Sequence, residues 1–273
     1  MRLARPLAAA LAALLPAALA ACGTAAGADT IAGADALTVG VKADQPGLGL
    51  AEPGGTFRGF EVEAGRYIAR HLGASRIDFK AVTSENRERL LDDGTVDLVL
   101  ASYSITADRS TKVTFGGPYY VAHQDIMVRR DETGIASVRD LAGRQMCQAG
   151  GSVSTERVVG GLGVRARLVP APSYSACVDM LLAGRVDAVS TGDLVLAGFA
   201  ARRRASVRIL NAPFTEERYG VGLRKGDIDG CEAVNKAITR MYQDGTASRM
   251  LAIWFGSSGV DLVYSVPEFE GCS

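Results

Sequence analysis

The sequence predicts an α/β protein built from two similar lobes. Short runs rich in β-branched residues alternate with stretches that carry apolar residues on one helical face, a pattern typical of sheets flanked by helices. The segment 90–99 is also echoed by 181–189, because each contains the end of a helix, a glycine and a strand. Two copies about ninety residues apart are too distant for a solenoid repeat and indicate two lobes with a ligand cleft between them.

Strands are predicted, in chain order, at 37–41, 77–82, 96–101, 167–169, 186–189 and 207–210. Helices are predicted at 61–72, 175–183 and 229–243. The first helix places Val62, Ile68 and Leu72 on one face and stops before Gly73, a residue suited to the left-handed position after a helix. Ligands of open α/β sheets bind beyond the carboxyl ends of strands, so the segments that follow these strands are the first candidates for a site.

The first 21 residues are expected to be a secretory signal. Arg2 and Arg5 precede an apolar run that lacks acidic residues and is shorter than the roughly 20 residues that span a bilayer. The run ends Leu19-Ala20-Ala21-Cys22, which is similar to the bacterial lipobox, so we expect a lipid on Cys22. A plain signal peptide with an incidental cysteine is the alternative. Residues 22–35, rich in Ala, Gly and Thr, are predicted to be a flexible tether.

The charge balance excludes a nucleic-acid binder. The chain has 30 basic and 30 acidic side chains, and loss of the signal would leave 28 basic against 30 acidic, whereas a nucleic-acid binder needs a basic face or tail. The two histidines, His71 and His123, are far apart in the sequence, which excludes a histidine-rich metal site. We therefore expect a monomer without metal or cofactor.

Four cysteines follow Cys22, an even number that suits an oxidising compartment. Three pairings are possible. We favour Cys147 with Cys177 and Cys231 with Cys272, which keeps each bridge within one region of the chain. Free thiols or a zinc site are the alternatives, and the lack of any Cys-x-x-Cys spacing argues against zinc.

Polar side chains follow the third predicted strand in the run Ser102-Tyr103-Ser104-Ile105-Thr106-Ala107-Asp108-Arg109. The fork of Arg109 matches a carboxylate in two parallel hydrogen bonds, although a surface arginine paired with Asp108 is the equal alternative. On spacing alone, Lys42 and Arg87 are better explained as surface residues. The amides of the run Gly150-Gly151-Ser152-Val153-Ser154-Thr155 could cradle an oxyanion, but this segment is more simply a turn.

Several motifs, in order, resemble the family 3 extracellular solute-binding proteins, and most of all the actinobacterial glutamate-binding lipoproteins of ABC importers. The resemblance covers about residues 36–256 and rests on 42–49, 59–63, 102–106, 116–120 and 244–246. It implies the type II periplasmic-binding-protein fold, a two-lobed Venus flytrap in which each lobe is a sheet flanked by helices. Lobe 1 would span 36–124 and 214–273 and lobe 2 would span 125–213, with crossovers near 123–128 and 214–219.

The resemblance also implies a ligand set. Arg109 would clamp the α-carboxylate of an amino acid, helped by Ser104 and Thr106 and by Ser152 and Val153 of lobe 2. Lys42 and Arg87 match cations that acidic-ligand relatives direct at a distal carboxylate, which implies glutamate or aspartate, with glutamine or asparagine left open. Neighbouring hydroxyls complete the predicted set, namely Ser84 and Ser102.

One acidic position departs from the family pattern. The aspartate that holds the ligand ammonium in relatives falls on Gly192, and the acid of this chain is Asp193, one residue later. Asp193 would bind the ammonium or, as the first residue of a helix, act only as its N-cap. Four aromatic residues could pack over the ligand but are more often core: Phe57, Phe60, Tyr103 and Tyr119. Trp254 is predicted to be core and His71 to be exposed, with His123 near the crossover.

The expected function is therefore capture of an amino acid by lobe closure at the extracellular face of the cell membrane, with delivery to an ABC permease. Two alternatives remain at this point. One is a sensory lipoprotein that presents the amino acid to a membrane receptor or kinase. The other is an enzyme like the cyclohexadienyl dehydratases that share the fold, although the chain has no Gly-x-Ser-x-Gly motif and no P-loop.

Overall fold

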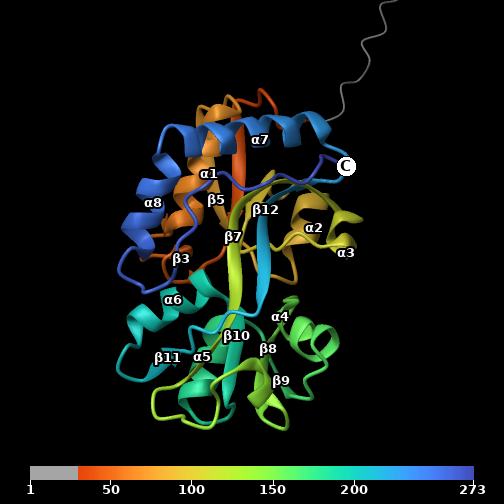
Figure 1. Cartoon of the computed structure of the whole chain (residues 1–273). Coiled ribbons are helices and arrows are strands. Elements are labelled where there is room, and N and C mark those ends of the chain that lie inside the picture. Colours follow the sequence, from red (N-terminus) through yellow and green to blue (C-terminus); the bar gives the residue numbers. More distant parts are fainter. Residues whose placement is uncertain (1–29) are drawn as a thin grey trace, which may run out of the picture.

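A computed structural model describes residues 30–273 (Figure 1). One sheet holds nine strands in the spatial order β5-β1-β6-β12-β7-β10-β8-β9, with β11 paired to β7. The strands are β1 (Ala36–Val41), β5 (Arg76–Ala81), β6 (Leu98–Leu100), β7 (Val113–Arg129), β8 (Gln145–Ala149), β9 (Arg167–Ala171), β10 (Ala188–Gly192), β11 (Val207–Ile209) and β12 (Thr215–Arg224). A second small sheet contains β2 (Asp44–Gln45), β3 (Gly49–Ala51) and β4 (Phe57–Arg58).

Helices cover the sheet of each lobe (Figure 1). Lobe 1 contains α1 (Phe60–His71), α2 (Arg87–Asp92), α3 (Ala107–Ser110), α7 (Ile228–Gln243) and α8 (Thr246–Phe255). Lobe 2 contains α4 (Ser154–Glu156), α5 (Tyr174–Leu182) and α6 (Asp193–Arg202). A 3-10 turn at Val138–Leu141 and a π-helical turn at Arg157–Gly161 complete it. The two-lobed α/β fold class is confirmed, and the three helices predicted by range lie within one residue of α1, α5 and α7 at each end.

The two lobes are joined by paired strands. β7 and β12 are antiparallel neighbours that both run from one lobe into the other, with Gln124 opposite Thr215 (Figure 1). The register of this pair shifts between Tyr219 and Val221, which marks an irregularity in the ladder. Both crossings between the lobes therefore lie inside strands, and the sheet is continuous through them.

The repeated sequence segment has the same structure in both lobes. α2 and α5 are each followed by a glycine with positive φ, 69° at Gly94 and 71° at Gly184. The aspartate after each turn then holds the neighbouring strand: Asp97 accepts from the Thr38 amide at 2.7 Å and Asp187 from the Gln145 amide at 2.9 Å. The repeated segment thus correctly predicts a helix, a turn and a strand in each lobe. Its two aspartates hold neighbouring strands in place.

The structure before β1 differs from the predicted flexible tether. The signal peptide, Cys22 and most of the tether lie outside the described residues. The last part of the predicted tether, residues 30–35, is held against lobe 1 instead of being a free linker. The Ile31 amide donates to Asp227 at 3.0 Å, and the Gly33 amide donates to the Leu72 carbonyl at 2.8 Å. The folded unit therefore begins before β1.

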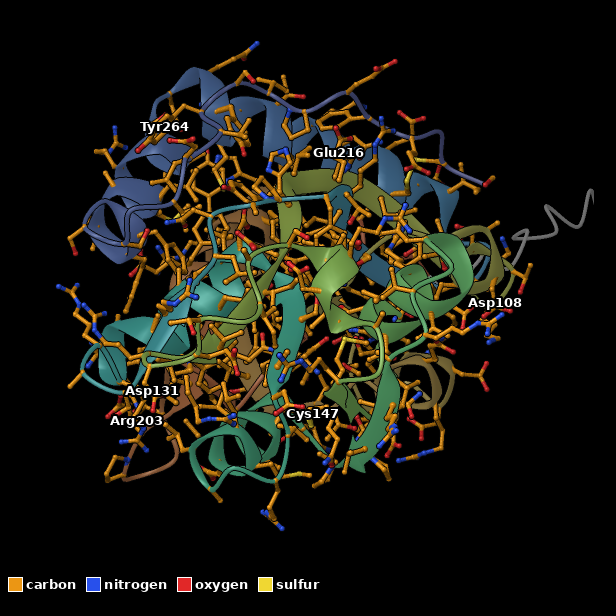
Figure 2. All side chains as sticks on the ribbon, turned by 60° about the horizontal axis from the view of Figure 1, so that its bottom comes forward. Asp108, Asp131, Cys147, Arg203, Glu216 and Tyr264 are labelled. Atoms are coloured by element: carbon orange, nitrogen blue, oxygen red, sulfur yellow. A yellow bond between two sulfur atoms is a disulfide. The ribbon has the colours of Figure 1, made fainter. Side chains whose placement is uncertain are left out.

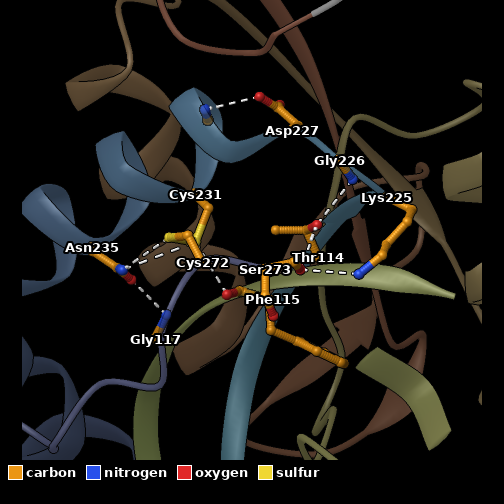
Figure 3. Close-up of a disulfide and its surroundings, with 11 residues drawn as sticks. Thr114, Phe115, Gly117, Lys225, Gly226, Asp227, Cys231, Asn235, Cys272 and Ser273 are labelled. Carbon is orange, nitrogen blue, oxygen red and sulfur yellow. Dashed lines mark hydrogen bonds between the residues drawn. A yellow bond between two sulfur atoms is a disulfide. The ribbon is translucent and has the colours of Figure 1, made fainter. Parts of the chain in front are cut away.

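Both predicted disulfides are present. Cys147 on β8 is bonded to Cys177 on α5, inside lobe 2, and Cys147 is labelled in Figure 2. Cys231 on α7 is bonded to Cys272, which fastens the C-terminal segment to lobe 1 (Figure 3). The Ser273 carbonyl beyond this bond accepts from the Thr114 hydroxyl at 3.2 Å and the Lys225 ammonium at 3.0 Å.

Candidate ligand-binding site

Two adjoining chambers lie between the lobes. The first, which we call the Arg109 chamber, has a volume of about 10 Å³, and the second, the Lys42 chamber, has about 230 Å³. Ser84 and Tyr174 line both of them. Seven predicted site residues line the Arg109 chamber: Ser84, Arg87, Ser102, Ser104, Arg109, Ser152 and Val153. The first chamber holds about one water molecule, so an amino acid needs the lobes or side chains to move apart.

Arg109 is buried and contacts both lobes. It is 5% exposed, and its two terminal nitrogens donate to the Ser104 carbonyl at 2.8 Å and to the Gly151 carbonyl of lobe 2 at 3.0 Å. Its neighbour Asp108 is exposed at the molecular edge (Figure 2) and pairs with Lys112 at 2.9 Å. The alternative in which Arg109 is a surface partner of Asp108 is therefore wrong. Burial lowers the pKa of Arg109, and the charged guanidinium is placed to receive an anion.

Arg87 corrects the expectation drawn from spacing, because it is 1% exposed and not a surface residue. One terminal nitrogen donates to the Ala101 carbonyl at 3.1 Å, while Nε has no hydrogen-bond partner. Its guanidinium lies 3.5 Å from the centre of the Tyr103 ring, and that of Arg109 lies 5.2 Å from the same ring. Cation–π contact with one tyrosine thus holds two arginines beside the chamber. Burial, and then the charge of Arg109, lowers the pKa of Arg87 to about 9.

Lys42 is also buried, at 5% exposed, and lines the second chamber. It follows β1 directly, and its ammonium donates to the Ser84 hydroxyl at 2.7 Å. Burial, and then the nearby charge of Arg87, lowers the pKa of Lys42 to about 7, although Asp44 and Glu61 act in the opposite direction. Lys42 is therefore a cation that an added carboxylate in this chamber would stabilise.

Glu61 lies behind the site and supports it. Its carboxylate is fully buried and accepts from the Ser102 amide at 2.6 Å and the Tyr119 hydroxyl at 2.5 Å, both through Oε1. Burial raises the pKa of Glu61, and the two hydrogen bonds together with Lys42 and Arg87 oppose that shift. Ser102, held in this way, has a left-handed backbone with φ of 44°, an unusual conformation for a serine.

The remaining predicted donors differ in their placement. The Ser152 hydroxyl lies 2.6 Å from the Tyr174 hydroxyl, which also donates to Ser154 at 2.9 Å, so lobe 2 presents a linked set of hydroxyls. Thr106 does not line either chamber. It caps α3 instead, because its hydroxyl accepts from the Arg109 amide at 3.3 Å. Thr106 therefore positions Arg109.

Asp193 lies outside both chambers, at the first turn of α6. Its carboxylate accepts from the His123 amide at 3.0 Å and lies 3.5 Å from His123 Nδ1, which ties α6 to the crossing strand β7. The N-cap of α6 is Gly192, not Asp193, so the capping alternative is wrong. Burial raises the pKa of Asp193 to about 6, against the hydrogen bond from His123. Its predicted contact with the ligand ammonium stays a prediction.

Sequence reasoning misses several residues of the Arg109 chamber, namely Tyr174, Thr191, Glu217 and Tyr219. Glu217 and Tyr219 lie on β12, inside the predicted return crossing between the lobes. Their place in this crossing was the sequence signal that could have identified them as site residues. Of the predicted aromatic residues, Tyr103 contacts the two arginines, while Phe60 and Tyr119 belong to the core. Phe57 is partly buried and packs against Phe79.

Two further predictions concern residues remote from the chambers. His71 is exposed as expected and stacks on Tyr67. Trp254 is only partly buried, so its assignment to the core is wrong. It packs against the core, donates to Glu63 at 3.0 Å and lies under the guanidinium of Arg58.

The architecture defines the class of protein. Two α/β lobes on a shared pair of strands, with a charged cavity between them, form a ligand-binding protein of the type II periplasmic fold. Residues 37–257 match the model of the bacterial extracellular solute-binding proteins, family 3. The chain belongs to this family.

Similar proteins agree with this assignment. The chain is 37% identical to the glutamate-binding protein GluB of Corynebacterium glutamicum, over 91% of this chain and 89% of that protein. An ancestral arginine-binding protein bound to arginine has a TM-score of 0.75 and 31% identity, covering 82% of this chain and 100% of that one. An ancestral amino acid-binding protein, described as a precursor of cyclohexadienyl dehydratase, has a TM-score of 0.73 and 28% identity, over 81% and 96%. Between residues 30 and 273, none of the helices has the length and apolar character that crossing a bilayer requires.

Proposed function

We propose that this protein captures an acidic amino acid, glutamate or aspartate, and delivers it to the permease of an ABC importer. The observation that carries the proposal is the buried group of three cations between the lobes, Lys42, Arg87 and Arg109. Burial of like charges is costly without anions nearby, so a ligand with two carboxylates suits the two chambers. Arg109 would bind the α-carboxylate and Lys42 the distal one.

The relatives support this choice of ligand without deciding it. GluB is named for glutamate, whereas the ancestral protein of similar fold holds arginine. The Lys42 chamber also contains Asp44, whose carboxylate accepts from the Ser175 hydroxyl of lobe 2 at 2.7 Å. Because Asp44 already has this partner and lies near Lys42, we favour a distal carboxylate over a distal cation. Glutamine or asparagine would fill the same chamber with a weaker, uncharged contact.

We further propose that the protein acts at the extracellular face of the membrane, anchored through a lipid on Cys22, and that closure of the lobes presents the loaded form to the permease. Arg109 contacts carbonyls of both lobes, and Asp44 and Ser175 join the lobes directly. Contacts made only in the closed form let a ligand shift the population toward closure.

A thermal-shift panel tests the ligand. We expect glutamate or aspartate to raise the melting temperature most, with glutamine and asparagine weaker and arginine inactive. A ligand at a thousand times its dissociation constant adds roughly 4 kcal/mol of stability. Stabilisation by arginine but not by any dicarboxylic amino acid would overturn the proposal. Chemical change of the ligand during incubation, detected by mass spectrometry, would instead favour an enzyme.

A further inference from the structure

One acidic side chain of the Arg109 chamber has no role in the proposed function. Glu217 lies on β12 close to the crossing between the lobes and is 2% exposed. Among the described residues that line this chamber, Glu217 alone is acidic. A carboxylate buried to this extent needs a compensating positive charge.

Glu217 has a partial partner already. Arg157 Nε lies 2.5 Å from Glu217 Oε1, and the Thr215 hydroxyl lies 3.3 Å from the same oxygen. The contact with Arg157 is not an aligned hydrogen bond, and the Arg157 side chain remains 31% exposed. Both contacts are made through Glu217 Oε1. The carboxylate has a second oxygen, Oε2, with which to contact a cation in the chamber.

Among the described residues, the neighbouring wall of the chamber offers no other acid. A β-carbon on Gly192 would overlap the Tyr219 hydroxyl, so a side chain at position 192 cannot extend into the chamber in this arrangement. The carboxylate of Asp193 contacts the backbone amide of His123 instead. Glu217 is thus the acid that faces the same space as Arg109.

We propose that Glu217 binds the α-ammonium of the ligand and thereby selects α-amino acids over acids that lack the amino group. The inference rests on the proposed function, because it needs Arg109 to hold the α-carboxylate. In an α-amino acid, the ammonium and the carboxylate are bonded to the same carbon. Their protein partners must therefore line the same chamber, as Arg109 and Glu217 do.

The test compares L-glutamate with glutarate, which has both carboxylates but no amino group, by calorimetry and by competition. In Glu217→Gln we expect L-glutamate affinity to fall at least about 30-fold while glutarate affinity does not fall. Glu216→Gln, at the exposed neighbouring position of β12, is the matched control and should retain the preference for L-glutamate. If Glu217 served only to hold Arg157, its substitution would weaken both ligands equally, and that result would overturn the inference.

A second variant keeps the test decisive if Glu217→Gln does not fold. Arg157 is partly exposed, and Arg157→Gln removes the competing cation from Glu217, so the preference for L-glutamate over glutarate should increase. An unchanged preference in that variant contradicts the inference.

The acidic-ligand proposal and the role of Glu217 can fail separately. If the wild-type protein binds a different amino acid, only the acidic-ligand proposal fails. The role of Glu217 is then tested with that amino acid and its amino-free analogue in place of L-glutamate and glutarate. If the wild-type protein binds no amino acid, both proposals fail.

Discussion

Lys42 is the residue on which the choice of an acidic ligand depends most. The residue is 5% exposed, and its ammonium donates to the Ser84 hydroxyl at 2.7 Å. In Lys42→Met, glutamate binding should lose roughly 2 to 5 kcal/mol, because the distal carboxylate would be buried without a cation. Calorimetry measures the loss, and Lys236→Met, at an exposed position of α7, is the control. Equal glutamate affinity in the two variants would contradict the role of Lys42.

The same residue predicts a pH dependence. Burial and Arg87 lower the pKa of Lys42 to about 7, with Arg109 acting in the same direction and Asp44 and Glu61 opposing. A bound carboxylate raises this pKa, so glutamate binds the protonated form and takes up a proton. Affinity should be highest below the free pKa and fall by up to about tenfold per pH unit as the pH rises above it.

Calorimetry in two buffers of different ionisation enthalpy measures the proton uptake directly. Lys42→Met should remove both the uptake and the decline of affinity above neutral pH. If the wild-type affinity is flat from pH 6 to about pH 9, Lys42 does not titrate with the ligand and the predicted coupling is absent.

At the scale of elements, closure depends on a close approach between α6 and the loop after β2. A β-carbon on Gly198 would overlap the Pro46 carbonyl oxygen of lobe 1. Gly198→Ala should therefore oppose closure and weaken ligand binding about tenfold or more, even though alanine favours the helix itself. Small-angle scattering with saturating ligand should show a larger radius of gyration than for wild type. Gly161→Ala, where the added carbon meets open space, should behave as wild type.

The elements differ in how far the sequence predicts them. Strands and helices of the repeated unit follow from local pattern, because apolar periodicity and a glycine stop act within ten residues. The long strand β7 is not predicted, since Gly116, Gly117 and Pro118 interrupt its apolar run, and its pairing with β12, β10 and β11 maintains it. α8 is missed as well.

The site is less predictable than the fold. Local spacing assigns Lys42 and Arg87 to the surface because it carries no information on what covers them. Their burial results from distant segments: the Tyr103 ring against Arg87, and lobe 2 across the chamber from Lys42. Glu217 is missed for the same reason. The Tyr219 hydroxyl also occupies the space that a side chain at position 192 would need. These two residues lie on different strands, so the sequence does not reveal this contact.

At the scale of the whole molecule, the C-terminal segment is fastened to lobe 1 by the bond between Cys272 and Cys231, 41 residues apart, in addition to the hydrogen bonds of Ser273. Asn235 binds the Gly117 amide beside this bond at 2.7 Å (Figure 3). Replacing both cysteines by serine should cost roughly 3 to 4 kcal/mol of unfolding free energy, measured by urea denaturation. The same change at Cys147 and Cys177 is the comparison within lobe 2. A midpoint equal to that of wild type would show that the bond contributes nothing.

The pairing of Gln124 with Thr215 has a consequence for dissecting the molecule. The chain leaves lobe 1 and re-enters it at facing positions of two adjacent strands, so residues 125–214 begin and end at the same place in the structure. A short β-turn that replaces residues 125–214 would rejoin the strands as a hairpin without a gap. The shortened protein, which consists of lobe 1 alone, would retain Arg109, Arg87 and Lys42 on an exposed surface. If it folds, lobe 1 is stable without lobe 2.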